Sequence, residues 1–226
     1  MASDIKNNIL EASSRLFYEQ GYNKTSLRQI AKACGIEIGN LYYYYKKKID
    51  LVLELRINKI SRDVEQIITF SGDMIYSYTG LIAIDYMLYS LLAVDHKACR
   101  VYVEASGEQE FKDLCANLHQ KLLIKLVGKE GLRIKPMEAF WANNYCCAGE
   151  IQMVNFCYNH ETSVNLDKLI IPCLIMRLLM LGLSEDEARL HAKEGIALAR
   201  SVIEEFGVNA YEWRKVKNSA FSLYGE

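Results

Sequence analysis

The 226-residue sequence contains only two prolines, Pro136 and Pro172, and no long hydrophobic run. Proline interrupts helices, so its scarcity leaves room for long continuous ones. A helix needs about 20 mostly apolar residues to span a bilayer. The most apolar stretch, residues 166–183, is broken by charged residues that include Asp167 and Arg177. We therefore expect no membrane partner, and the polar, helix-patterned N-terminus predicts no signal peptide.

Signatures of common enzyme classes are absent as well. The sequence has no glycine-rich phosphate loop, no nucleophile elbow, no His-Glu-x-x-His motif and no carboxylate pattern of a di-iron helix bundle. The 7 cysteines are an odd number and lack the spacing of a small disulfide scaffold, which fits a reducing compartment. We predict a cytoplasmic protein that is not an enzyme, with no catalytic residue, no cofactor and no metal site.

Apolar residues recur at helical spacing almost throughout, and no alternating strand pattern is convincing. The sequence therefore predicts an all-α fold. Two short helices are expected between residues 25 and 45, separated by Gly35. The other expected helices cover residues 3–19, 47–70, 74–94, 96–104, 109–128, 136–159, 165–182 and 185–206.

Positive charge is concentrated at the start of the chain. Residues 1–50 carry eight lysines and arginines against five acids, a net charge of +3, although the whole chain has a net charge of −1. A small basic region on an acidic remainder is typical of a protein whose one end meets phosphate.

The segment from Thr25 to Val52 has the spacing of a helix-turn-helix. A small residue, Ala31, stands where the second helix meets the third, and Gly35 supplies the backbone conformation of the tight turn. Leu41 would anchor the third helix to the core. That placement leaves Glu37, Asn40 and Tyr43 facing outward.

With these features in place, the segment from Ile9 to Leu51 resembles the N-terminal domain of the TetR family, also called TetR/AcrR. The matching positions are Ala12, Leu16, Phe17, Gly21, Tyr22, Thr25, Ser26, Ile30, Ala31, Gly35, Gly39, Leu41, Tyr42, Tyr44, Tyr45, Lys48 and Leu51. The resemblance implies a three-helix helix-turn-helix domain over residues 1–50 and a larger helical ligand-binding and dimerisation domain over residues 51–226. It also implies a transcriptional regulator, usually a repressor.

The resemblance further implies a homodimer on a palindromic operator in double-stranded DNA. Thr25, Ser26, Tyr42 and Lys48 would contact the phosphate backbone, and Arg28, Glu37, Asn40 and Tyr43 would reach base edges. Glu37 and Ile38 depart from the family pattern, which commonly has Ser or Thr and then Lys or Arg at these positions. The operator sequence is therefore left open.

In the body, the resemblance implies a small-molecule effector and a dimer interface formed by residues 136–159 and 165–182. The middle helices are rich in aromatic residues, which favours a largely apolar or aromatic ligand. Among them stand polar residues that would need partners if buried: Asp85, Glu104, Asn143, Asn144 and Glu150. The predicted ligand-binding residues are Tyr86, Tyr89, Tyr102, Glu104, Phe111, Trp141, Asn144 and Tyr145.

An alternative is a helical regulator that responds to a metal or an oxidant. His96 and Cys99 lie three residues apart, and Cys115 and His119 lie four apart, so each pair shares one helix face. Together the four could hold Zn²⁺ if their helices are adjacent. Ordinary interior thiols and surface histidines are the competing interpretation. Cys146 and Cys147 could sense oxidants, although neighbouring residues on a helix point apart.

Overall fold

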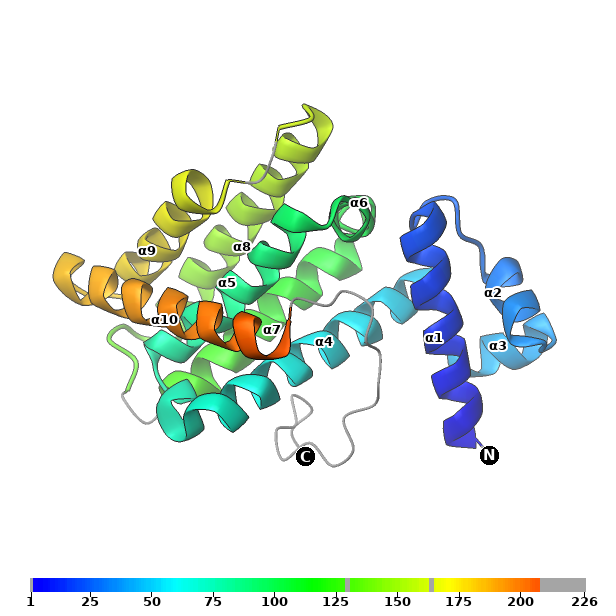
Figure 1. Cartoon of the computed structure of the whole chain (residues 1–226), viewed down its shortest axis with the longest axis horizontal. Helices are drawn as coiled ribbons and strands as arrows, with labels where there is room; N and C mark the ends of the chain where they lie inside the picture. The colour runs from blue at the N-terminus through cyan, green and yellow to red at the C-terminus, as the bar shows by residue number, and fades with distance from the viewer. Residues whose placement is uncertain (1, 129–130, 163–164, 208–226) are drawn as a thin grey trace.

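The computed structural model describes residues 2–128, 131–162 and 165–207, and this part of the chain contains helices and no strand (Figure 1). The predicted all-α fold is confirmed. The elements are α1 (Ala2–Gln20), α2 (Leu27–Cys34), α3 (Ile38–Tyr44), α4 (Lys48–Ser71), η1 (Gly72–Ile75), α5 (Tyr78–Val94), α6 (His96–Ala105), α7 (Gln109–Val127), α8 (Pro136–Asn159), η2 (Leu166–Ile170), α9 (Ile171–Met180) and α10 (Glu185–Phe206). No helix in the described ranges is long and apolar enough to cross a membrane.

Helices α1–α3 form a small head at one end of the molecule, and α4 runs from this head into the body (Figure 1). The core of the head is built from Ile9, Phe17, Ile30 and Leu41, all at most 2% exposed. Burying one such side chain contributes about 1.5–3 kcal/mol. The head therefore has an apolar core of its own, joined to the body through a continuous helix.

Two predicted helices differ from the observed ones at their starts. The helix expected from residue 74 begins at Tyr78, because the Ser77 hydroxyl caps it by accepting from the Gly80 amide. Residues 166–170 form a wide π turn before α9, and Pro172, which has no amide hydrogen, stands in the first turn of α9. Helices α8 and α10 begin and end as predicted.

Helix α5 lies at the centre of the body and is buried along most of its length. It packs against α4, α6, α7, α9 and α10. Helix α10 comes close to α5 at Gly195, where a Cβ atom would lie 2.6 Å from the Thr79 carbonyl oxygen. Such a contact is possible only for glycine. The helices around α5 also enclose the cavity described below.

Candidate DNA interface and ligand cavity

The turn between α2 and α3 is fixed by local hydrogen bonds. Gly35 ends α2 in the left-handed conformation, with φ of 67°, and the Ile36 amide donates to the Ala31 carbonyl at 3.0 Å. Left-handed backbone at a helix end favours glycine. Ala31 is 3% exposed and Leu41 is fully buried, so the two short helices pack closely. The structure therefore has the geometry of a helix-turn-helix.

One face of this motif presents polar and aromatic side chains to solvent. Arg28, Glu37, Asn40, Tyr42 and Tyr43 are all exposed, and Tyr43 reaches 78%. Glu37 occupies the position before α3, but its carboxylate does not cap the helix. These side chains are thus free to face a partner, in the places predicted for DNA contacts.

Two of the predicted phosphate contacts are engaged within the protein. The buried Thr25 hydroxyl donates to the Gly21 carbonyl at 2.7 Å and accepts from the Gln20 side chain at 3.1 Å. The exposed Ser26 forms a capping box with Gln29 at the start of α2. Both hydroxyls therefore shape the N-terminus of α2, whose backbone amides can still face a phosphate.

Lys48, the third predicted phosphate contact, is also engaged. Its Nζ donates to the Tyr22 carbonyl at 2.7 Å and lies 4.0 Å from the centre of the Tyr22 ring. Burial lowers the pKa of Lys48, against the opposing effect of Glu108 and Glu104. In this structure Lys48 anchors the turn after α1 to the start of α4.

The same turn is attached to the body. The Asn23 amide donates to Glu104 at 2.7 Å, and the Tyr22 hydroxyl donates to Glu108 at 3.1 Å. Further along α1, Arg100 donates to the Tyr18 carbonyl at 2.8 Å. Glu104 was predicted to bind ligand, but the structure places it at the contact between head and body.

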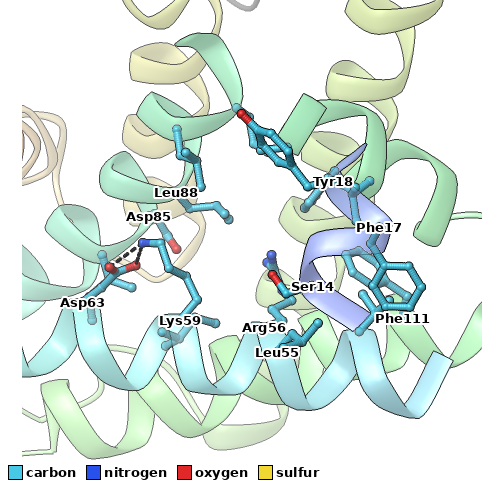
Figure 2. Close-up of a pocket in the computed structure, with 18 of the residues that line it drawn as sticks. Ser14, Phe17, Tyr18, Leu55, Arg56, Lys59, Asp63, Asp85, Leu88 and Phe111 are labelled. Atoms are coloured by element: carbon cyan, nitrogen blue, oxygen red, sulfur yellow. Dashed lines mark hydrogen bonds and ion pairs between the residues drawn. The ribbon is translucent and has the colours of Figure 1, made fainter. Parts of the chain in front are cut away.

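A cavity of about 140 Å³ lies between head and body, enclosed by α1, α4, α5, α6 and α7 (Figure 2). Its walls are mainly apolar, with leucines from α4 and α5, Val101 of α6 and Phe111 of α7. Three side chains of α1, Ser14, Phe17 and Tyr18, complete the wall. A molecule in this cavity would touch the head directly.

Two basic residues, two acidic residues and one histidine also line the cavity: Arg56, Lys59, Asp63, Asp85 and His119. Lys59 and Asp63 form an ion pair at 2.5 Å, seen in Figure 2 along one turn of α4. Asp85 accepts from His119 at 2.8 Å. Arg56 instead lies against aromatic rings, 5.3 Å from the centre of Tyr102 and 5.4 Å from that of Phe111.

Behind Asp85 and His119 extends a buried polar network. Arg177, which is fully buried, lies 2.5 Å from Glu150 and 3.6 Å from Asp85, and it donates to Asn143 at 3.2 Å. Burial alone would lower the pKa of Arg177, but the carboxylates of Glu150 and Asp85 raise it well above its ordinary value. The sequence-based expectation that Asp85, Asn143 and Glu150 need partners is met here.

The predicted ligand-binding residues are scattered by the fold. Tyr102 and Phe111 line the cavity. The hydroxyl of the buried Tyr89 donates to Glu150, and that of Tyr86 accepts from Arg200. The sequence did not identify Arg56 and Lys59 as cavity residues, because a lysine or arginine on an amphipathic helix is normally expected to face solvent.

Three predicted ligand residues of α8 lie away from the cavity. Trp141 and Tyr145 are 64% and 71% exposed on the outer surface, so we no longer assign them to a ligand site. Asn144 lines a second, more polar cavity of about 540 Å³ between α6, α7 and α8. The aromatic richness of the middle helices indicated a cavity, but it did not say which face of α8 is buried.

The four residues proposed for a metal do not assemble among the residues the structure describes. His119 instead groups with Cys147 and Glu150, with ligand atoms within 4.8 Å of one another. The ring of His96 packs against that of Tyr158, on a different side of the bundle. Arg177 contacts both Glu150 and the Cys147 sulfur, so a cation already occupies this cluster. The predicted four-ligand set is therefore wrong.

Cys146 and Cys147 point in different directions, as expected for neighbours on a helix. The Cys146 thiol contacts the Met180 sulfur at 3.8 Å, whereas Cys147 lies 3.2 Å from Nδ1 of His119. Burial alone would raise the pKa of Cys147, but the positive charges of His119 and Arg177 lower it below its ordinary value. Burial raises the pKa of Cys146 to about 12. The pKa values of the two neighbouring thiols are thus shifted in opposite directions.

The family model that matches this chain covers the head and the start of α4. Residues 9–55 match the family model described as bacterial regulatory proteins, tetR family. The HTH-type transcriptional regulator AcrR of Shigella flexneri is 43% identical over 54 residues, 24% of this chain and 25% of that protein. An HTH-type transcriptional regulator of Staphylococcus aureus (strain MRSA252) is 33% identical over 117 residues, 48% of this chain and 60% of that protein. The chain thus spans between a quarter and three fifths of these relatives.

Two solved structures are only distantly similar to the chain. The fatty acid degradation regulator FadR from Bacillus halodurans covers 79% of this chain and 95% of its own, with 22% identity and a TM-score of 0.49. A gamma-butyrolactone receptor covers 89% of this chain and 98% of its own, with 14% identity and a TM-score of 0.40.

Proposed function

We propose that the protein is a transcriptional regulator of the tetR type whose DNA affinity is set by a small ligand, because residues 9–55 match the model of that family. It binds a palindromic operator in double-stranded DNA as a homodimer. Its effect is repression, released when a largely apolar or aromatic molecule occupies the cavity next to the head. The exposed face of α2 and α3 carries the DNA contacts.

The observation that carries this proposal is the shared wall of the cavity. Phe17 and Tyr18 belong to α1 of the head, and Leu55 and Arg56 belong to the helix that joins the head to the body. A ligand that fits one position of α1 better than another shifts the population of head orientations. By linkage, the DNA that selects an orientation changes ligand affinity by the same factor.

A homodimer is supported by an exposed stripe on α8. Met137, Trp141 and Tyr145 lie four residues apart, so they follow one face of the helix, and each is at least 64% exposed. A contiguous apolar patch of this kind marks an interaction surface. In such a homodimer a second copy packs on this stripe about a twofold axis. The two heads must then lie roughly 34–36 Å apart to enter successive major grooves.

The test is selection from random double-stranded DNA at several salt concentrations. We expect a short palindrome to be enriched, with affinity falling steeply as salt rises. The matched control is the double variant Arg28→Ala/Tyr43→Ala, which changes only exposed side chains and should fold normally. Recovery of no palindrome by the wild-type protein, or equal recovery by the double variant, would overturn the assignment.

Oxidant sensing through Cys147 is the second candidate, favoured by its contact with His119 and its place on the wall of the second cavity. A peroxide entering there would be attacked by the Cys147 thiolate. The O–O bond breaks, hydroxide leaves and a sulfenic acid forms. Peroxide should then lower operator affinity of the wild type and of Cys146→Ser, but not of Cys147→Ser. An equal response of all three would exclude this thiol.

A further inference from the structure

The side chain of Arg56 projects from the middle of α4 into the cavity (Figure 2). Its guanidinium lies against the rings of Tyr102 and Phe111, which meet edge to face. Within the described ranges, no ion pair joins it to a carboxylate and its Nε has no hydrogen-bond partner, although its side chain contacts the Cys115 thiol. Arginine stays charged at any physiological pH, and this half-buried cation has only aromatic rings and a thiol as partners.

The other charges around the cavity balance one another. Lys59 pairs with Asp63 at 2.5 Å, and His119 pairs with Asp85 at 2.8 Å. Each carboxylate on the wall therefore already has a cationic partner, whereas the Arg56 guanidinium is paired with no carboxylate. A charge that is partly removed from water and has no opposite charge beside it is costly, so the cavity next to Arg56 favours an anion.

The rest of the wall selects against small hydrated anions. Leu55, Leu88, Leu91 and Leu92 face the cavity together with Val101. An inorganic ion would lose its water here and gain a single cationic partner. A dianion would in addition be repelled by Asp63 and Asp85. The chemistry that fits is one negative charge attached to an apolar group.

We propose that the cavity binds an amphipathic monocarboxylate, either an aromatic acid or a short- to medium-chain fatty acid. Its carboxylate forms a two-point contact with the Arg56 guanidinium, and its hydrocarbon part packs on the leucines. The planar fork of arginine matches a carboxylate in this way, whereas a lysine offers a point charge. Cavities of this size accommodate a benzene-sized group. The inference rests on the proposed function only in treating this cavity as the effector site.

The test is calorimetric titration of the full chain with octanoate and benzoate, alongside octanol, benzyl alcohol and sodium phosphate. We expect both carboxylates to bind more tightly than their alcohols. Arg56→Met should weaken carboxylate binding at least tenfold and leave alcohol binding within about twofold, since charge-assisted hydrogen bonds are worth about 1.5–3 kcal/mol. The carboxylate affinity of Arg56→Lys should lie between that of the wild type and that of Arg56→Met. Arg189→Met, on the exposed Arg189–Glu185 pair of α10, is the matched control and should bind like the wild type.

Several outcomes would overturn the inference. These are carboxylates and alcohols binding alike, no binding of either carboxylate, binding of phosphate alone, or unchanged carboxylate affinity in Arg56→Met. Thermal melts of each variant show whether it is folded, and octanol binding reports an intact cavity. Operator selection is measured separately. If the wild type selects an operator but binds no carboxylate, this inference alone is refuted. If carboxylate binding depends on Arg56 but the wild type selects no operator, the proposed function alone is refuted.

Discussion

His119 donates from Nε2 to the Asp85 carboxylate across 2.8 Å, in a buried contact between α7 and α5. Its other nitrogen, Nδ1, lies 2.8 Å from the Cys115 carbonyl, which can only accept. A ring that donates from both nitrogens is an imidazolium. Burial alone would lower the pKa of His119, but the neighbouring Cys147 and Asp85 raise it well above its ordinary value. The pair is therefore ionised at neutral pH.

The first prediction concerns pH. The pKa of His119 in the folded state is raised above its unfolded value of about 6.5. The stabilisation by protonated His119 is therefore fully present below about pH 6.5. It is lost as pH rises through the folded-state pKa. The difference in unfolding free energy between wild type and His119→Gln should therefore shrink above about pH 7, by at most about 1.4 kcal/mol per pH unit. Urea titrations followed by circular dichroism at pH 6–10 measure it, and a constant difference would contradict the ion pair.

At the acid end the sign is reversed. The charges of His119 and Arg177 hold the pKa of Asp85 below its ordinary value, despite its burial. Its stabilising contribution is therefore present above the unfolded pKa of about 3.9 and is lost as pH falls through the folded-state value. The wild type should consequently have its largest advantage over Asp85→Asn in the neutral range.

The second prediction concerns the Arg177–Glu150 pair, 2.5 Å apart at the centre of the body. Removing one member of a buried pair leaves the other charge without compensation, so Arg177→Met should cost about 3–5 kcal/mol of unfolding free energy. The double variant Arg177→Met/Glu150→Gln should cost less than the two single variants added together. The exposed Arg189–Glu185 pair is the control, and Arg189→Met should change stability by less than about 1 kcal/mol. Additive costs in the double-mutant cycle would contradict direct coupling.

The head could be predicted from the sequence because its determinants are local. Ala31, Gly35 and Leu41 act within one motif, and their spacing alone fixes how α2 meets α3. The capping box of Ser184 and Glu187 is also local, and α10 begins where this pattern predicts. The domain boundary predicted at residue 50 stays a prediction, since the cavity joins both sides of it.

The interior of the body could not be predicted in the same way. Cys115 and His119 do share a helix face, as their spacing indicated, but the helix opposite them is α5 with Asp85 rather than the one carrying His96. Which helices become neighbours depends on contacts between residues that are far apart in the sequence. The position of Arg56 in the cavity could not be predicted either, because the residues around it in the sequence resemble those around an exposed arginine.

The third prediction concerns base readout. Tyr43 of α3 is 78% exposed, so Tyr43→Ala should change the preference among operator variants by about 1–3 kcal/mol. Lys46→Ala removes an exposed charge beside the motif and should weaken binding to all sequences alike, lowering the salt slope by about 1 per protomer. Competition binding on a panel of operator variants distinguishes the two effects. If Tyr43→Ala only lowered affinity uniformly, α3 would not read bases through this residue.

Fourth, the contact between α10 and α5 should be intolerant of any added atom at Gly195. A Cβ there would lie 2.6 Å from the Thr79 carbonyl oxygen and 2.8 Å from Ile82. Gly195→Ala should therefore lower the unfolding free energy by about 1–3 kcal/mol, even though alanine is the better helix former. The control is Gly39→Ala in α3, where nothing lies within 4 Å of the added atom. Thermal denaturation should show a lower midpoint for the first variant and no loss for the second.

The fifth prediction tests the surface proposed for dimerisation. Trp141 is 64% exposed on α8, in line with Met137 and Tyr145, and a second copy seated there would bury it. Trp141→Glu would place a carboxylate at the centre of that contact, where an unpaired charge is destabilising. We expect sedimentation equilibrium to give twice the 25.9 kDa chain mass for the wild type and the chain mass for the variant.

The matched control is Val94→Glu at the end of α5, where an equally exposed apolar residue, 74% accessible, lies off this stripe. It should remain dimeric and keep its operator affinity. Trp141→Glu should lose affinity for a full palindrome while retaining weak binding to a half-site, because each head is intact and only their spacing is lost. A dimeric Trp141→Glu would place the interface on another face, and the exposed α8 stripe would then need a different partner.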